Sequence, residues 1–395
     1  MTVHSGTSDA LFESDPFPHF QRSLGLFRPV GRAVGARAVV VVLVGWFPLL
    51  VLILADALNS SSALIPFLKD FGVHARSLIA APLFVICEAV VLQRLDAITY
   101  HFINAGLIAS EDRQHFHRLI ERCKGLMRST LIEVLAFAAS YLLAIIALRY
   151  IPPSIMPAWY SVPGSSHQMS WAGWWYTIVS VPLLSILIFS WLLRVMLWGR
   201  FLFSVSRMKL RLISAHPDHA AGLRFLNAEL FAFMPLAFTF GVIAAGTVAN
   251  NVTYHGASLD QLRNTVIGLL IFVLVIFVGP LMVFVYNLHR QKVAGIYSYG
   301  KLADSVGRQF ERKWLTNYDK VGAGALEAPD FSATTDLYQI AENVYQVSIV
   351  PFEVRTTLIL CITTLLPFVP VLLMLVPLKV ILKDAASVLF GISPT

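Results

Sequence analysis

Two histidines and an aspartate lie close together in the segment "SAHPDHAAGL", residues 214–223. His216, Asp218 and His219 could bind a divalent metal, because imidazole and carboxylate groups are ligands for zinc, iron or nickel. The histidines could instead respond to pH, since they titrate near neutrality. A structural alternative is a tight turn, because proline disfavours helix in the preceding residue and serine and aspartate are favoured caps.

Four charged residues lie inside or at the ends of long apolar runs: Glu88, Arg194, Glu133 and Glu229. A charge in hydrocarbon costs at least about 2.5 kcal/mol, so such a group should face the protein interior or a water-filled cavity. Glu88 and Arg194 each precede a basic residue by six positions, which places them about 9 Å inside the membrane edge. We predict that Glu88 and Arg194 form an ion pair or line one vestibule, so that exchanging both charges should restore what either reversal destroys.

The alternative is that these groups reach the membrane surface. A long side chain such as Arg194 can bend toward the headgroups. Glu133 and Glu229 lie near the ends of their runs and suit a position at the interface. Glu88 is too short to reach the interface from its depth, so the alternative fits it least.

The apolar runs also define the fold. Of 395 residues, 57% are hydrophobic and 13% are charged, whereas soluble domains carry about 25% charged residues. A membrane-crossing helix needs about 20 apolar residues. We therefore predict an all-α fold, a polytopic transmembrane helical bundle of about seven spans, at 38–55, 77–92, 130–148, 174–197, 230–249, 265–286 and 356–378.

The positions of lysine and arginine predict a cytoplasmic N-terminus. In that orientation 24 of the 30 basic residues lie on the cytoplasmic side, as the positive-inside rule requires. The net charge of +7 then reflects membrane topology, and we expect no nucleic-acid partner. The expected partners are the lipid bilayer of the cell membrane and, in a homo-oligomer, further copies of the chain.

Several predicted helices continue past the membrane edge with one apolar face. One continuation forms a helical hairpin at 94–129, and another follows the sixth span. We expect these faces to pack on each other as a cytoplasmic helical layer, or against another subunit. The predicted organisation is a cytoplasmic N-terminal segment, the membrane bundle, a cytoplasmic helical segment and a last span with its tail, at 1–37, 38–288, 289–355 and 356–395.

Two features of the spans bear on packing. Prolines fall inside six of the seven predicted spans, where each removes a backbone hydrogen bond and kinks or breaks the helix. The fifth span carries Gly241, Ala245, Gly246 and Thr247, small residues that permit close helix contact.

The loop "HPDHAAGLRFL" resembles one found in uncharacterised bacterial inner-membrane proteins, in which the pattern is HPD-x-x-GGL. The resemblance covers about a dozen residues, and Ala221 stands where the first glycine of the pair would be. It implies a bacterial cytoplasmic membrane and carries no activity.

Three functions follow from these patterns. The first is a channel or carrier with a polar site around Glu88 and Arg194. The second is a membrane sensor or scaffold that binds a cytoplasmic partner. The third is a metalloenzyme that uses the histidine loop, to which His115 and His117 could contribute ligands. Nucleophile, dinucleotide and CxxC motifs are absent from the sequence, so we lean against an enzyme and predict no cofactor other than that divalent metal.

Overall fold

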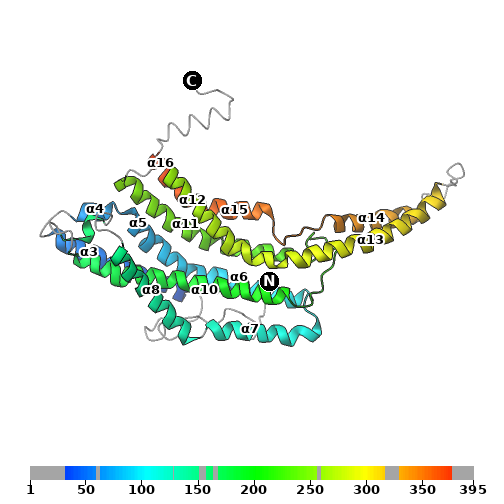
Figure 1. The fold of residues 1–395 in the computed structure, drawn as a ribbon, viewed down its shortest axis with the longest axis horizontal. Helices are drawn as coiled ribbons and strands as arrows, with labels where there is room; N and C mark the ends of the chain where they lie inside the picture. The colour runs from blue at the N-terminus through cyan, green and yellow to red at the C-terminus, as the bar shows by residue number, and fades with distance from the viewer. Residues whose placement is uncertain are drawn as a thin grey trace, which may run out of the picture.

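The chain is all-α, as predicted. The structure is a computed structural model that describes residues 32–58, 63–127, 129–150, 157–162, 168–255, 259–315 and 329–375. Within these ranges there is no strand, and pairing between extended segments is limited to two isolated bridges, Ile108 with Leu210 and Ser161 with Met169. The helices form an elongated bundle from which a long helical arm projects (Figure 1).

Seven described helical segments are long and apolar enough to cross a membrane, which confirms the predicted multi-pass bundle. A crossing needs about 20 residues, but the second, fourth and sixth segments have 34, 36 and 55. These three therefore extend well beyond a bilayer, as predicted. The segments are Val34–Ala57, Phe71–Asn104, Thr130–Tyr150, Trp171–Ser206, Arg224–Tyr254, Asp260–Trp314 and Val354–Met374.

Four of the spans contain no π-helical turn among their described residues. The first consists of α2 (Arg32–Gly45) and α3 (Phe47–Ala57), followed by the short α4 (Leu64–Leu68). The third is α8 (Thr130–Tyr150). The fifth is α11 (Asn227–His255), preceded by the 3-10 turn η6 (Arg224–Leu226). The seventh joins α15 (Val354–Leu365), η11 (Leu366–Phe368) and α16 (Val369–Leu375).

The other three spans each contain a π-helical turn just before a proline. Pro82, Pro182 and Pro280 each follow such a turn by two residues. A proline displaces the carbonyl one turn earlier and cannot donate to it, and a π turn accommodates the extra backbone. The elements are α5 (Phe71–His74), η1 (Ala75–Ala80) and α6 (Ala81–Asn104); α9 (Trp171–Trp175), η5 (Tyr176–Ser180) and α10 (Val181–Ser206); and α12 (Leu259–Val273), η7 (Leu274–Val278), η8 (Gly279–Phe284) and α13 (Val285–Trp314).

Helix α11 is the central helix, and it packs against α5, α6, α12 and α15. Two of its glycines allow the close contacts predicted for the small residues of this span. A Cβ at Gly241 would lie 2.1 Å from the carbonyl oxygen of Thr364 on α15, and one at Gly246 would lie 2.5 Å from the Cβ of Ala75.

The helical packing predicted for the extensions beyond the spans is present in part. The end of α6 turns into η2 (Ser110–Asp112) and α7 (Arg113–Met127), which packs back on α10. Phe102, Phe116 and Phe201 join these three helices through ring contacts of 5.6–6.5 Å. This corner of the structure is the expected hairpin at 94–129.

The segment 289–355 departs from that prediction. Helix α13 leaves the bundle and pairs with α14 (Asp330–Tyr345) as a projecting arm (Figure 1). The ring of Phe331 on α14 packs against those of Phe310 and Trp314 on α13. Because α14 covers part of the apolar stripe of α13, the layer is not needed to cover it.

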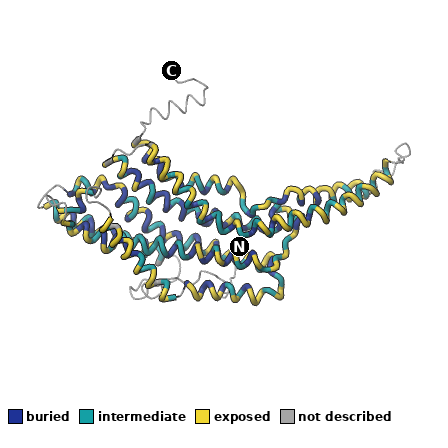
Figure 2. Tube along the Cα trace, viewed as in Figure 1, coloured by how far each residue is buried: buried dark blue, intermediate teal, exposed yellow. Residues whose placement is uncertain are grey.

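Burial follows the membrane-bundle pattern. Buried residues line the faces that the helices turn toward one another, and exposed residues lie on the outside and along the arm (Figure 2). The largest fully buried side chains include Trp191, Trp198, Phe233 and Phe277. On the outside of α8, Leu131, Leu142 and Ile145 are all more than half exposed, which suits contact with lipid.

Candidate functional site

A carboxylate lies between two guanidinium groups inside the membrane-spanning helices. The Nη1 atom of Arg194 is 2.8 Å from Oε1 of Glu88, and Nη2 of Arg37 is 2.7 Å from Oε2. The side chain of Arg194 is 2% exposed, whereas those of Glu88 and Arg37 are 12% and 16% exposed. We call these three residues the charge cluster. The predicted pair of Glu88 and Arg194 is therefore present.

Three helices position the charge cluster. Arg37 belongs to α2, Glu88 to α6 and Arg194 to α10, and both α2 and α10 pack against α6. Trp191 fixes the contact of α6 with α10, because its indole donates a hydrogen bond of 2.9 Å to the carbonyl oxygen of Phe84. The guanidinium of Arg194 lies 5.1 Å from the centre of the Trp191 ring, a cation–π contact that favours one orientation of that charge.

Arg37 is the member that sequence reasoning missed. The predicted boundary placed residues 1–37 in a cytoplasmic segment, but α2 begins at Arg32 and a candidate span begins at Val34. Arg37 directly precedes the longest apolar part of this helix, so it resembled a flanking charge. The predicted rescue by exchanging the charges of Glu88 and Arg194 stays a prediction, and in that variant an arginine at position 88 would also face Arg37.

Of the two remaining glutamates, the structure describes the side chain of Glu229 but not that of Glu133. Glu229 is fully buried in the first turn of α11, beside the indole of Trp198. Neither of its carboxyl oxygens has another hydrogen-bond partner among the described residues. Glu229 therefore faces the protein interior, which is one of the two positions considered for these buried charges. Glu133 is part of α8, but its side chain lies outside the described part of the structure.

Asp218 organises the histidine loop. Its Oδ1 accepts hydrogen bonds from the N–H groups of Ala220 and Gly222, at 2.8 and 3.1 Å, and Oδ2 accepts one from Arg224 at 3.1 Å. Burial acts to raise the pKa of the Asp218 carboxyl group, but these three bonds and the contact with His216 outweigh it. The pKa of Asp218 therefore lies below its ordinary value, and its main role is that of a turn residue.

The backbone of this loop is unusual at two residues that are not glycine. His219 and Ala221 have φ of 52° and 54°, and Gly222 has φ of 95°. Side chains other than glycine disfavour this left-handed region. A glycine at position 221, as in the HPD-x-x-GGL pattern, would adopt the same backbone without that cost.

The histidines do not assemble a metal site. Among the described residues, no three histidine, cysteine, aspartate or glutamate side chains gather closely enough to hold a metal ion. His216 pairs with Asp218 at 2.8 Å, while His115 and His117 lie on the separate helix α7. The geometry thus favours the turn over the metal centre.

A second polar cluster, which sequence reasoning missed, surrounds Asp70. This fully buried residue caps α5 through the N–H of Val73 at 2.9 Å. It also accepts hydrogen bonds from the indole of Trp159 at 3.0 Å and from the amide of Asn250 at 2.7 Å. Asp70 precedes Glu88 by eighteen residues, about 27 Å along a helix, so Asp70 lies at the start of the second span and Glu88 near its middle.

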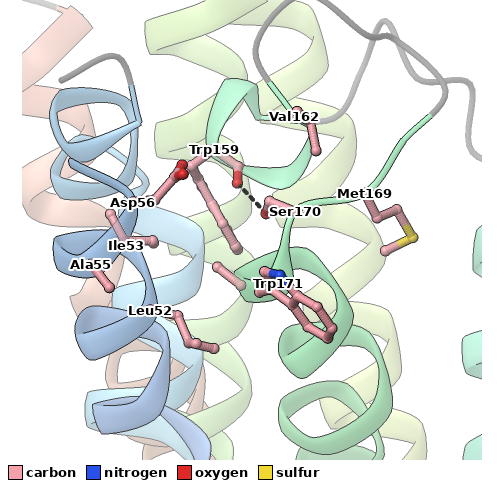
Figure 3. Close-up of a pocket in the computed structure, with 10 residues that line it drawn as sticks. Leu52, Ile53, Ala55, Asp56, Trp159, Val162, Met169, Ser170 and Trp171 are labelled. Atoms are coloured by element: carbon pink, nitrogen blue, oxygen red, sulfur yellow. Dashed lines mark hydrogen bonds between the residues drawn. The ribbon is translucent and has the colours of Figure 1, made fainter. Parts of the chain in front are cut away.

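A cavity of about 270 Å³ shares Trp159 with the Asp70 cluster. Figure 3 shows the residues that line this cavity. Leu52, Ile53 and Asp56 of α3 line it on one side, and Trp159 and Ser170 line it on the other. The hydroxyl of Ser170 donates to the carbonyl oxygen of Trp159 at 2.8 Å, which holds the start of α9 against this wall. The lining is mostly apolar, and the Asp70 carboxylate is engaged by its three donors, so the arrangement suits structural packing.

Comparison with known protein families, with curated proteins and with solved structures gives no match to this chain.

Proposed function

We propose that this membrane protein is a channel or carrier whose polar pathway includes the charge cluster. The observation that supports the proposal is the Glu88 carboxylate, held between Arg37 and Arg194 within the membrane-spanning helices. Ionised groups at such depth are costly and usually mark a pathway for ions or polar solutes. Three π-helical turns at prolines add support, because π turns inside α-helices are frequent at functional sites.

The cluster suggests how a solute would be handled. Arg194 is almost fully enclosed and fixed by Trp191, while Arg37 is the more accessible partner. A solute cation could replace Arg37 at Glu88, and a solute anion could bind Arg37 in place of Glu88. In either case Arg37 moves and the pair of Glu88 and Arg194 stays.

The test is flux in proteoliposomes. The purified chain is reconstituted and flux is followed with proton-, potassium- and chloride-sensitive dyes under an imposed gradient. Arg37→Gln removes the group that an anion would bind and that a cation would have to displace, so it should lower anion flux or raise cation flux about tenfold, equivalent to about 1.4 kcal/mol. The matched control is Arg263→Gln, which removes an exposed arginine paired with Asp260 at 3.1 Å and should leave flux unchanged. Liposomes sealed to all three ions would contradict the proposal.

We also propose that the N-terminus lies in the cytoplasm of a bacterial cell, with the chain in the inner membrane. The distribution of lysine and arginine supports this orientation. An alkaline phosphatase fusion after residue 165 should be active, because that position then lies outside. A silent fusion there, together with an active one after residue 110, would reverse the orientation.

A second candidate function is that of a scaffold, and the projecting arm favours it. Tyr297 on the arm helix α13 is 77% exposed, and exposed aromatic side chains are common anchors in protein interfaces. A partner or a second copy of the chain should then be retained on purification and lost in a Tyr297→Ser variant. If the protein remains monomeric and without a partner in both forms, the scaffold function is wrong.

A further inference from the structure

A second cavity, of about 280 Å³, lies beside the histidine loop. Its walls come from the end of α6, from the loop that follows α10 and from the start of η6. His101 contributes from α6, Arg211 and His216 from the loop, and Arg224 and Phe225 from η6. The cavity therefore lies where the second and fourth spans end and the fifth begins.

The lining carries an excess of hydrogen-bond donors. The cavity is lined by two arginines, Arg211 and Arg224, and by a single carboxylate, that of Asp218. Both oxygens of Asp218 already accept backbone N–H groups. Little of the acceptor capacity in this cavity thus remains for the two arginines.

The two arginines differ in how far they are engaged. Arg224 donates from Nε to the carbonyl oxygen of Asp218 at 3.1 Å and from Nη1 to that of Phe352 at 3.4 Å. The guanidinium of Arg211 has no hydrogen bond or ion pair within the described parts of the chain. Arg211 is exposed, so its charge is available to a ligand at the mouth of the cavity.

Part of the remaining wall is aromatic. The rings of His101 and Phe225 lie 4.4 Å apart, centre to centre. A ligand between them and the arginines would combine an anionic group with a small apolar or hydroxylated part. Arginine favours phosphate because its planar fork can donate two parallel hydrogen bonds. The volume lies just below the ~300 Å³ at which drug-sized pockets begin, so a phosphate ester of about glycerol phosphate size fits better than a nucleotide.

We infer that this cavity binds a small phosphate ester, with Arg211 and Arg224 as the phosphate-binding residues. The ester could be soluble or could be the headgroup of an anionic lipid, because both present the same chemistry and the cavity lies at the ends of three spans. The site is separate from the charge cluster, so it does not depend on the transport proposal.

The experiment uses the full chain in two forms. In detergent, calorimetric titration with glycerol 3-phosphate measures a soluble ligand. In nanodiscs of phosphatidylcholine, added phosphatidylglycerol or phosphatidic acid measures a lipid headgroup through the rise in melting temperature. Binding of glycerol 3-phosphate in detergent identifies a soluble ester. A rise in melting temperature in nanodiscs alone identifies a lipid headgroup. Either result supports the site.

Two variants separate the site from general charge attraction. Arg211→Gln removes an arginine with no described partner, so the protein should fold and bind about tenfold more weakly, as expected for about 1.4 kcal/mol. Lys209→Gln removes one positive charge from the same exposed segment but not from the cavity wall, and binding should change less than about twofold. No binding to the wild-type protein, or equal weakening in both variants, would overturn the inference.

Discussion

Replacing Glu88 by glutamine tests the charge cluster most severely. Glutamine keeps nearly the same shape and can accept a hydrogen bond, so the change removes mainly the negative charge. The variant leaves Arg37 and Arg194 facing the same position, 16% and 2% exposed, without a carboxylate between them. The expected result is a large loss of stability with the fold otherwise retained.

The magnitude follows from the geometry. Charge centres about 4 Å apart attract by about 4 kcal/mol at an effective dielectric constant of 20, and removing one partner from a buried pair costs about 3–5 kcal/mol. Glu88→Gln should therefore cost about 3–5 kcal/mol. Arg37→Gln leaves a neutral pair and should cost only about 1.5–3 kcal/mol, the value of one charged hydrogen bond.

The double variant gives the sharpest test. Adding Arg194→Gln to Glu88→Gln removes the fully enclosed guanidinium and keeps that of Arg37, which is the more exposed of the two and can turn toward the headgroups. The double variant should therefore be more stable than Glu88→Gln by itself. The assay is unfolding in mixed micelles, followed by tryptophan fluorescence, with Arg263→Gln as the control. If the two losses simply add, or if Glu88→Gln costs less than about 1 kcal/mol, the three charges are not coupled as described.

Three further predictions concern the loop and the helix contacts. Gly222→Ala should destabilise the protein by about 1–2 kcal/mol through its φ alone, since the added Cβ would meet only Leu107 at 3.4 Å. The control, Gly125→Ala in helix α7, has nothing within 4 Å and should stabilise the protein by about 0.5–1 kcal/mol. Equal effects of the two substitutions would contradict this. Gly241→Ala should destabilise the protein by about 1–3 kcal/mol because the added Cβ forces α11 and α15 apart. Gly268→Ala, which has open space around it, should not destabilise it. Thermal melting of both variants measures the difference. Because the pKa of Asp218 is lowered in the folded protein, its contribution to stability is complete above its ordinary pKa of about 4 and is lost as pH falls through the lower folded value. The melting temperature should therefore fall more steeply in acid for the wild type than for Asp218→Asn. Parallel curves of melting temperature against pH would refute this role of Asp218.

The span pattern and the pairing of Glu88 with Arg194 could be predicted because each depends on local information. Runs of apolar residues give the spans directly, and the depth of a charge follows from its distance to the nearest flanking arginine. Two opposite charges at similar depth in neighbouring spans have few other partners. The turn role of Asp218 was also visible in the "HPD" sequence, because the proline and the aspartate both favour it.

The parts that were missed depend on contacts between distant segments. Arg37 looked like a flanking charge because nothing near it in sequence shows that α2 packs against Glu88. Asp70 lies in a short polar stretch that resembles a loop, and its partners, Trp159 and Asn250, come from 89 and 180 residues away. The arm was expected to join a layer, because an amphipathic stripe shows that a helix needs a partner but does not show which one.

The central claim is that a carboxylate is held between two guanidiniums inside a lipid-embedded bundle. Its most direct test is the structure of the full chain in lipid nanodiscs, determined by electron cryomicroscopy. The expected result is a lipid belt around the seven spans, with the Glu88 carboxylate within about 4 Å, the ion-pair limit, of the guanidiniums of both Arg37 and Arg194. A map in which Glu88 faces bulk water outside the belt, or in which neither arginine contacts it, would contradict the claim.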